Sequence, residues 1–322
     1  MGNIVSNYKD SDDAVHPFDS ENYYEWWYLD GVFENGYTFT HSCFWRTIVG
    51  GMRVPVVLMH IYTPDGKRLE GADGFSYSDC HASPDKCDVA MGKNYIRQEG
   101  DLYKLSVHAM NVGADLTYKR KFPGWKWSED GLLINDETGK HGWVNALPRA
   151  DVTGNLFIDG KAIPVKGEGY HDHNWGNVLM SGSMTGWIWG RMFHKDYTFV
   201  YFDLLPLTGE TGIRSALYLV RGDEPLFASP AMKFTTGNNI LHGETGNSIP
   251  TDIVFEGSLG KVDVHCHLDV VKVLEAIKSE ADPNGHTSYY YRRLNKYNAR
   301  ITVDGKTFIV TGEAINEHVL LR

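Results

Sequence analysis

The sequence has 322 residues, of which 42% are hydrophobic and 13% aromatic, enough for a large packed core. Its 31 basic and 41 acidic residues give a net charge of −10 without a basic stripe, so we expect no nucleic-acid partner. No apolar run approaches the roughly 18 to 20 residues of a membrane-spanning helix, so we expect no transmembrane segment.

The first seventeen residues are polar and acidic, and they lack the basic and apolar regions of a secretory signal. We therefore predict a flexible N-terminal leader over 1–17 and a cytoplasmic protein. After this leader, the segment YTFTHSCFWR at 37–46 places mostly aromatic side chains on one face and mostly small polar side chains on the other. This alternation is typical of a half-buried strand.

The same alternation, or a run of β-branched residues, recurs along the chain between clusters of Gly, Pro, Asp and Asn. These segments are 103–109, 187–193, 197–205, 213–221, 262–268 and 299–303. We predict an all-β fold with few short helices. Only 270–279 has helical spacing, with apolar residues at Val270, Val273, Leu274 and Ile277.

An internal repeat relates two distant parts of the chain. NLFIDGKAIPVKGEGYHDH at 155–173 aligns without a gap with RITVDGKTFIVTGEAINEH at 300–318, including the DGK turn and the last His. Each segment predicts a strand, an Asp-Gly turn and a returning strand. We infer two tandem β-barrel-like halves, over 18–180 and 181–322, and a ligand pocket at the domain junction.

The motif YHDHNWG at 170–176 is the first candidate for chemistry. In an extended segment, His171, His173 and Trp175 point to one side. The two histidines alone are too few for a metal centre, and VHCH at 264–267 adds only another pair, so we predict no metal. The alternatives are proton transfer and a structural role in a tight turn.

Two further segments place an acid among aromatic residues. In YEWWYLDG, Glu25 precedes Trp27 and Tyr28, which are either core residues or contacts for a ligand. In YTFVYFDLL, Tyr201 and Asp203 share a face with aromatic and aliphatic residues. A buried Asp203 would suit a general acid, whereas an exposed one would cap the next turn.

Familiar catalytic templates are absent: the sequence has no GxSxG, P-loop, HExxH or GxGxxG signature. This leaves cofactor-free chemistry or simple binding of a ligand. No cofactor is therefore expected.

The motifs EWWYLDG, GYHDHNWG and YFD together resemble the hydroxyneurosporene synthase family, also called carotenoid 1,2-hydratases, and the related AttH-like proteins. The resemblance runs from about residue 23 to the C-terminus and implies two lipocalin-like domains. Hydratases of the family add water to an isoprenoid double bond without a cofactor, and fungal relatives are Diels–Alderases.

The resemblance also assigns roles to residues. It implies that Asp203 donates a proton, that His173 and Tyr201 orient it or a water, and that Trp175 faces the developing cation. Residues assigned to substrate binding are Glu25, Trp27, Tyr28, His171, Trp187 and Trp189.

The leading hypothesis is a cofactor-independent lyase or isomerase acting on a C=C bond of a terpenoid or polyene, by acid-initiated hydration, dehydration or cyclisation. One alternative is a Diels–Alderase-type pericyclase that only folds its substrate. The other is a lipocalin-like carrier without catalytic activity. All three require a hydrophobic small molecule as the partner.

Overall fold

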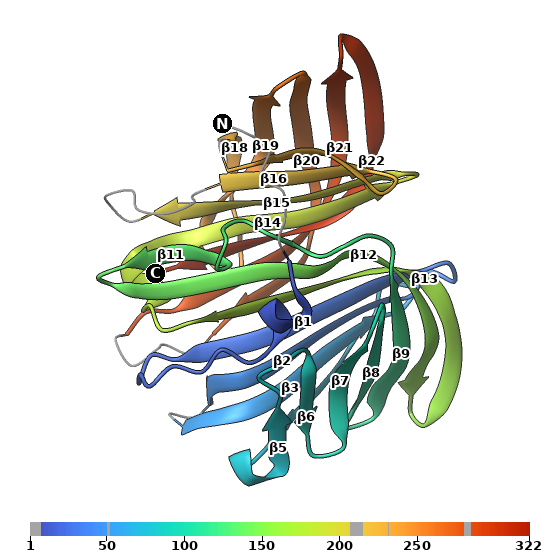
Figure 1. The fold of residues 1–322 in the computed structure, drawn as a ribbon, viewed down its shortest axis with the longest axis vertical. Coiled ribbons are helices and arrows are strands. Elements are labelled where there is room, and N and C mark those ends of the chain that lie inside the picture. Colours follow the sequence, from blue (N-terminus) through green and yellow to red (C-terminus); the bar gives the residue numbers. More distant parts are fainter. Residues whose placement is uncertain (1–7, 50–51, 207–214, 231, 280–284) are drawn as a thin grey trace. The chain divides into compact units, whose positions relative to one another are not determined.

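The computed structural model describes residues 8–49, 52–206, 215–230, 232–279 and 285–322, and nearly all of their regular structure is β (Figure 1). The one α-helix among these residues is α1 (Met180–Ser183), joined by two short 3-10 helices, η1 (Asp10–Asp13) and η2 (Tyr77–Asp79). The all-β prediction is therefore confirmed. No helix in the described part of the chain is long and apolar enough to cross a membrane.

The chain divides into two compact units, and the division falls after Val178. We call the described residues up to Val178 the first unit and Leu179–Arg322 the second unit. The boundary expected from the sequence was residue 180.

The first unit contains a single antiparallel sheet in the order β4-β3-β2-β1-β13-β12-β9-β8-β7-β6-β5, with β10 and β11 also paired to β12. The sheet curls, so that β4 approaches β8 and β9. Its strands are β1 (Tyr24–Phe33), β2 (Thr38–Val49), β3 (Met52–Tyr62), β4 (Arg68–Gly74), β5 (Cys80–Ala82), β6 (Asp88–Met91), β7 (Asn94–Glu99), β8 (Leu102–Ala109), β9 (Val112–Arg120), β10 (Trp125–Lys126), β11 (Leu132–Asp136), β12 (Gly139–Ile158) and β13 (Lys161–Gly176).

The second unit contains an antiparallel sheet in the order β17-β16-β15-β14-β22-β21-β20-β19-β18. In both units the first strand therefore pairs with the last. The strands are β14 (Met184–His194), β15 (Tyr197–Pro206), β16 (Ser215–Arg221), β17 (Glu224–Ser229), β18 (Lys233–Leu241), β19 (Ser248–Leu259), β20 (Val262–Lys278), β21 (Ser288–Val303) and β22 (Lys306–Leu321).

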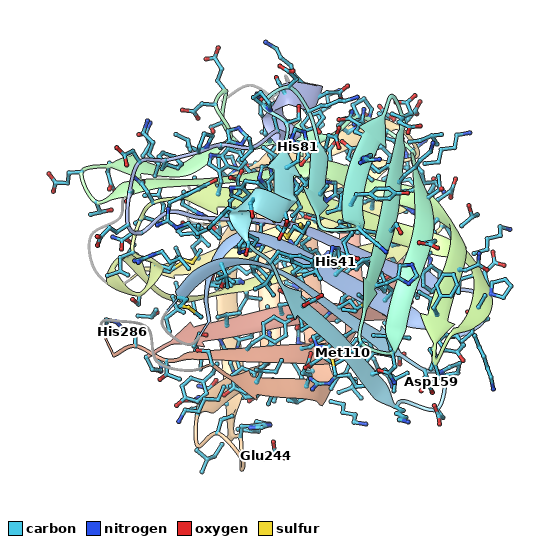
Figure 2. All side chains as sticks on the ribbon, turned by 90° about the horizontal axis from the view of Figure 1, so that it is seen from below. His41, His81, Met110, Asp159, Glu244 and His286 are labelled. Atoms are coloured by element: carbon cyan, nitrogen blue, oxygen red, sulfur yellow. The ribbon has the colours of Figure 1, made fainter. Side chains whose placement is uncertain are left out.

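The predicted repeat corresponds to the closing hairpin of each unit, β12–β13 and β21–β22. Both hairpins turn at an Asp-Gly pair with positive φ, 50° and 75° at Asp159 and Gly160 and 48° and 77° at Asp304 and Gly305. Such turns match the right-handed twist of the flanking strands. Figure 2 labels Asp159 at the first of these turns.

The helix predicted over 270–279 was wrong, because residues 270–278 belong to β20. The pairing of β20 with β21 shifts register between Val270 and Lys272 and again between Val273 and Glu275. Each irregularity adds a residue and resets the alternation of faces. Two such shifts in one strand give apolar residues the spacing of a helix.

Each curled sheet encloses its own apolar core. In the first unit, Phe39, Met59 and Tyr118 are fully buried, and in the second unit Phe199 and Phe255 are. Both interiors also contain buried polar and charged side chains. These polar residues are the candidates for chemistry, because a buried ionisable group is costly unless it is paired or has a function.

Candidate functional site

The two motifs of the first unit lie on neighbouring strands. Strand β1 is antiparallel to β13, with Trp27 opposite His173 and Glu25 opposite Trp175. Opposite residues of paired strands project from the same face of a sheet. The sequence-predicted residues Glu25, Trp27, His171, His173 and Trp175 therefore share one face, and each is at most 2% exposed.

Tyr28 lies on the other face of β1. It is opposite Asp172 and its hydroxyl donates a hydrogen bond to Asp30 at 3.2 Å. The structure therefore separates Tyr28 from the face that carries His173, although the sequence analysis assigned both to one pocket.

Glu25 and His173 form a buried acid–imidazole pair. Glu25 Oε1 is 2.8 Å from His173 Nε2 and accepts a bond of 2.8 Å from the backbone N–H of His16, while the Tyr23 hydroxyl donates to Oε2. Burial by itself would raise the pKa of Glu25, but the bonds from His16, His173 and Tyr23 outweigh it and lower that pKa. Glu25 is consequently an anion at neutral pH.

Asp13 and His171 form a second pair beside the first. Asp13 Oδ2 is 2.9 Å from His171 Nε2, and His171 Nδ1 donates to the Tyr28 carbonyl at 2.8 Å. Burial would lower the pKa of His171, but the charge and hydrogen bond of Asp13 outweigh burial and raise it. Asp13 therefore favours the protonated form of His171.

The two pairs meet at one further contact. His173 Nδ1 is 3.5 Å from Asp13 Oδ1, and neither atom has a hydrogen-bond partner among the described residues. Burial lowers the pKa of His173, although Glu25 opposes this effect, so the ring is neutral and donates through Nε2. The open Nδ1 can accept a proton, which Asp13 would then stabilise.

Aromatic rings surround this cluster. Trp27 stacks on His173 with ring centres 4.3 Å apart, and Trp175 stacks on His16 at 3.9 Å. Gly142 makes room for the second stack, because a Cβ at that position would lie 2.2 Å from an atom of the Trp175 ring. The rings limit access of water and provide π faces for a cation.

Within the described part of the chain, three groups of side chains lie close enough to hold a metal ion: Asp13, Cys87 and His171; His16, Glu25 and His173; and the more exposed Asp252, His267 and Asp269. In both buried groups the nearest histidine nitrogen already bonds the carboxylate, so an ion would have to replace that bond. Burial also raises the pKa of the Cys87 thiol, which disfavours the thiolate that metals bind.

The remaining predicted residues lie in the second unit. On β15, Tyr201 is 0% and Asp203 5% exposed, so the alternative of an exposed Asp203 at the strand's end is excluded. Asp203 is opposite Ile188 of β14, whereas Trp189 is opposite Phe202 and Trp187 opposite Leu204. The two tryptophans therefore project from the face opposite to Tyr201 and Asp203.

Asp13 and His16 were missed in the sequence analysis, because both lie in the segment predicted to be a flexible leader. Asp13 ends η1 and is fully buried, and the Trp27 indole N–H donates to its carbonyl at 3.1 Å. The sequence signal for this packing is weak: DSDDAVH at 10–16 resembles any solvated acidic turn. Residues 1–7 lie outside the described part.

Comparison with known proteins agrees with the motifs. Residues 119–238 match the family model of carotenoid hydratase CrtC, a range that contains GYHDHNWG and YFD but not Glu25. The chain is related to the carotenoid hydratases. This confirms the resemblance inferred from the sequence.

Individual proteins show the same relationship. A hydroxyneurosporene dehydrogenase of Chlorobaculum tepidum is 26% identical over 271 residues, which are 66% of this chain and 68% of that protein. Two solved structures share the fold: a putative AttH from Nitrosomonas europaea (TM-score 0.66, 17% identity, 99% of both chains) and kievitone hydratase from Nectria haematococca (TM-score 0.64, 16% identity, 99% of this chain and 97% of that one).

Proposed function

We propose that the protein is a cofactor-independent enzyme that starts a reaction at a C=C bond of a hydrophobic terpenoid or polyene by protonating it. In hydration and cyclisation, water or an internal alkene adds to the cation formed in that step, and a proton is then released. Dehydration is the reverse of hydration: the acid protonates a hydroxyl group, water leaves, and the same cation loses a proton to form the C=C bond. We assign proton donation to Asp203, with Tyr201 on the same face of β15. The roles of His173, in orienting Asp203 or a water, and of Trp175, in facing the cation, are carried over from the resemblance alone.

The observation that carries the proposal is the burial of Asp203. Its carboxyl group is 5% exposed and continues the face on which Phe199 and Tyr201 are fully buried. A buried carboxyl group on a strand face that otherwise carries aromatic and aliphatic side chains can serve as a general acid. A positioned acid contributes typically about 10² to 10⁴ in rate.

The protonation states of Tyr201 and His173 are compatible with these roles. Burial raises the pKa of Tyr201, so its hydroxyl stays protonated and able to donate a hydrogen bond. His173 is neutral and has an open nitrogen, as a group that accepts a proton from water must. An aromatic face stabilises a nearby cation by about 0.5 to 2 kcal/mol.

The relatives support the class of reaction. The matching family is described as a carotenoid hydratase, and a structure with the same fold is a kievitone hydratase. Addition of water to an alkene requires the protonation that we assign to Asp203. Of the residues that the resemblance assigns to substrate binding, we retain Glu25, Trp27 and His171, which share the face of His173. Tyr28, Trp187 and Trp189 project from the opposite faces of their strands and are not retained.

The test is Asp203→Asn, assayed by product formation from a panel of acyclic terpenoids and polyenes. We expect turnover to fall by at least about 100-fold, because the amide cannot donate an acidic proton. Asp196→Asn is the matched control, since Asp196 is exposed in the turn just before β15. Full activity of Asp203→Asn would remove Asp203 from the mechanism.

A further inference from the structure

Arg293 on β21 is a fully buried cation in the second unit. Its Nε donates to Asn316 Oδ1 at 3.0 Å and its Nη1 to the Pro250 carbonyl at 3.1 Å, with His318 Nδ1 at 3.5 Å. Its Nη2 has no hydrogen-bond partner, and no Asp or Glu of the described residues forms an ion pair with it.

The adjacent arginine shows what a structural arrangement looks like. Arg292 is 6% exposed and lies 3.5 Å from Glu275 and 3.4 Å from Glu317, so its charge is balanced by two carboxylates. Successive residues of a strand face opposite sides, so the two arginines lie on different faces of β21. The more deeply buried one is the one without a counterion.

An unbalanced buried charge destabilises the fold. Burial lowers the pKa of Arg293 to about 10, against a smaller opposing effect of Tyr201, so the guanidinium remains charged at neutral pH. The desolvation of such an ion costs several kcal/mol, which is normally offset by a bound anion or a paired carboxylate. A fold that retains this charge without a partner indicates a binding function.

Arg293 belongs to a row of residues that crosses four adjacent strands. Asn316 of β22 is opposite Arg293 of β21, Gly190 of β14 is opposite Asn316, and Tyr201 of β15 is opposite Gly190. Gly190 has no side chain, and a Cβ there would lie 2.4 Å from Tyr201 Oη. The row therefore brings a guanidinium, an amide and a phenol together on one face.

All of these groups can donate hydrogen bonds. The Asn316 oxygen already accepts from Arg293, and the Asn316 amide nitrogen has no hydrogen-bond partner among the described residues. Tyr201 remains protonated, and no partner among the described residues accepts its hydrogen. His318 beside the row is neutral, because burial, aided by Arg293 and Arg322, lowers its pKa to about 3.

We propose that Arg293, Asn316 and Tyr201, the Arg293 row, bind an anionic oxygen of the substrate, a carboxylate or an enolate. The inference rests on the proposed function and specifies its substrate: an oxygenated terpenoid or polyene rather than a pure hydrocarbon. A hydrocarbon would leave the guanidinium buried and unpaired, whereas a carboxylate or enolate accepts from Nη2 with a charge-assisted bond.

The test uses three polyenes that differ only in their head group: all-trans-retinoic acid, retinal and retinol. Binding is measured by quenching of the protein's nine tryptophans. We expect retinoate to bind at least about tenfold more tightly than retinol, because a hydrogen bond to a charged group contributes that much. Equal affinity of the unchanged protein for retinoate and retinol would overturn the proposal, whether or not any variant folds.

The variant Arg293→Gln tests whether Arg293 causes the preference for retinoate over retinol. We expect the ratio of retinoate to retinol affinity to fall to within about twofold, and the rise in Tm caused by retinoate to disappear. In the matched control Arg292→Lys, which keeps the charge beside Glu275 and Glu317, the ratio should not change. An unchanged ratio in Arg293→Gln would refute the assignment.

The two proposals fail separately. Asp203→Asn should still prefer retinoate while losing turnover. If the protein prefers no head group but still needs Asp203 for turnover, only the anion site at the Arg293 row is overturned. If it prefers retinoate but does not need Asp203 for turnover, only the role of Asp203 as the acid is overturned.

Discussion

The two units share a strand order and a closing hairpin, yet they bury opposite charges in corresponding places. In the aligned hairpins His173 corresponds to His318. His173 bonds Glu25 and lies near Asp13, whereas His318 lies 3.5 Å from Arg293. His173 thus lies next to two carboxyl groups, and His318 lies next to a guanidinium group.

This difference shows that the two halves retain the same sheet architecture while their buried polar residues differ. The hairpins and the pairing of first with last strand depend on turn geometry and on alternation of apolar residues, which both halves retain. The polar positions of the interior do not determine the sheet, so they can diverge toward different chemistry. The interior of the first unit pairs histidines with carboxylates, whereas the second unit contains Arg293, which by our proposal binds an anion, and Asp203, the proposed acid.

The largest expected effect comes from removing a buried carboxyl group of the first unit. Asp13→Ala leaves the buried His171 ring without its partner at 2.9 Å. We expect the free energy of unfolding to fall by about 3 to 5 kcal/mol, measured by urea denaturation. Asp10→Ala is the control, since its side chain is 53% exposed and should change stability by less than about 0.5 kcal/mol. Similar losses in both variants would contradict the account of Asp13.

A smaller effect is expected at Gly142, which leaves space for the ring of Trp175. Gly142→Ala places a methyl group 2.2 Å from Trp175, and we expect a loss of about 1 to 3 kcal/mol in unfolding free energy together with reduced turnover. Gly243→Ala, with no heavy atom within 4 Å of the added carbon, serves as the control. Unchanged stability and turnover in Gly142→Ala would show that the position of the Trp175 ring does not depend on a glycine at residue 142.

The smallest effect separates the two histidine environments by pH. His318 has a lowered pKa, so its contribution to stability is present above about pH 6.5 and is lost as pH falls toward 3. His171 has a raised pKa, so its contribution is present below about pH 6.5 and is lost as pH rises through its folded-state pKa.

The two substitutions should therefore act on opposite sides of neutrality. His318→Gln should reduce the loss of unfolding free energy between pH 6 and 4 by up to about 1.4 kcal/mol per pH unit, and His171→Gln should instead flatten the alkaline side. Urea titrations at several pH values measure both slopes. Identical pH profiles for the two variants would contradict the difference between the units.

Much of this architecture could be predicted from the sequence, because it is encoded in local patterns. Alternation predicted the strands, the two DGK segments predicted the hairpins, and the alternation within GYHDHNWG predicted that His171, His173 and Trp175 share a face. The helix over 270–279 failed because register shifts within β20 depend on its partner β21 and are not visible in one strand alone.

The site was less predictable, because its key contacts join distant parts of the chain. Asp13 meets His171 across 158 positions, and nothing near Asp13 in the sequence marks it as buried. Arg293 follows another arginine, and only the pairing of β21 shows which of the two lacks a counterion. Long-range pairing of polar groups is set by the sheet and not by local sequence.

Incorporation of deuterium tests the central claim most directly. In the reaction run in heavy water, the protein should place one deuterium per turnover on the product carbon next to the new bond, and Asp203→Asn should form almost no product. An unlabelled product would identify a pericyclase, and a ligand returned unchanged would identify a carrier. Either result would contradict proton donation as the step that the protein catalyses.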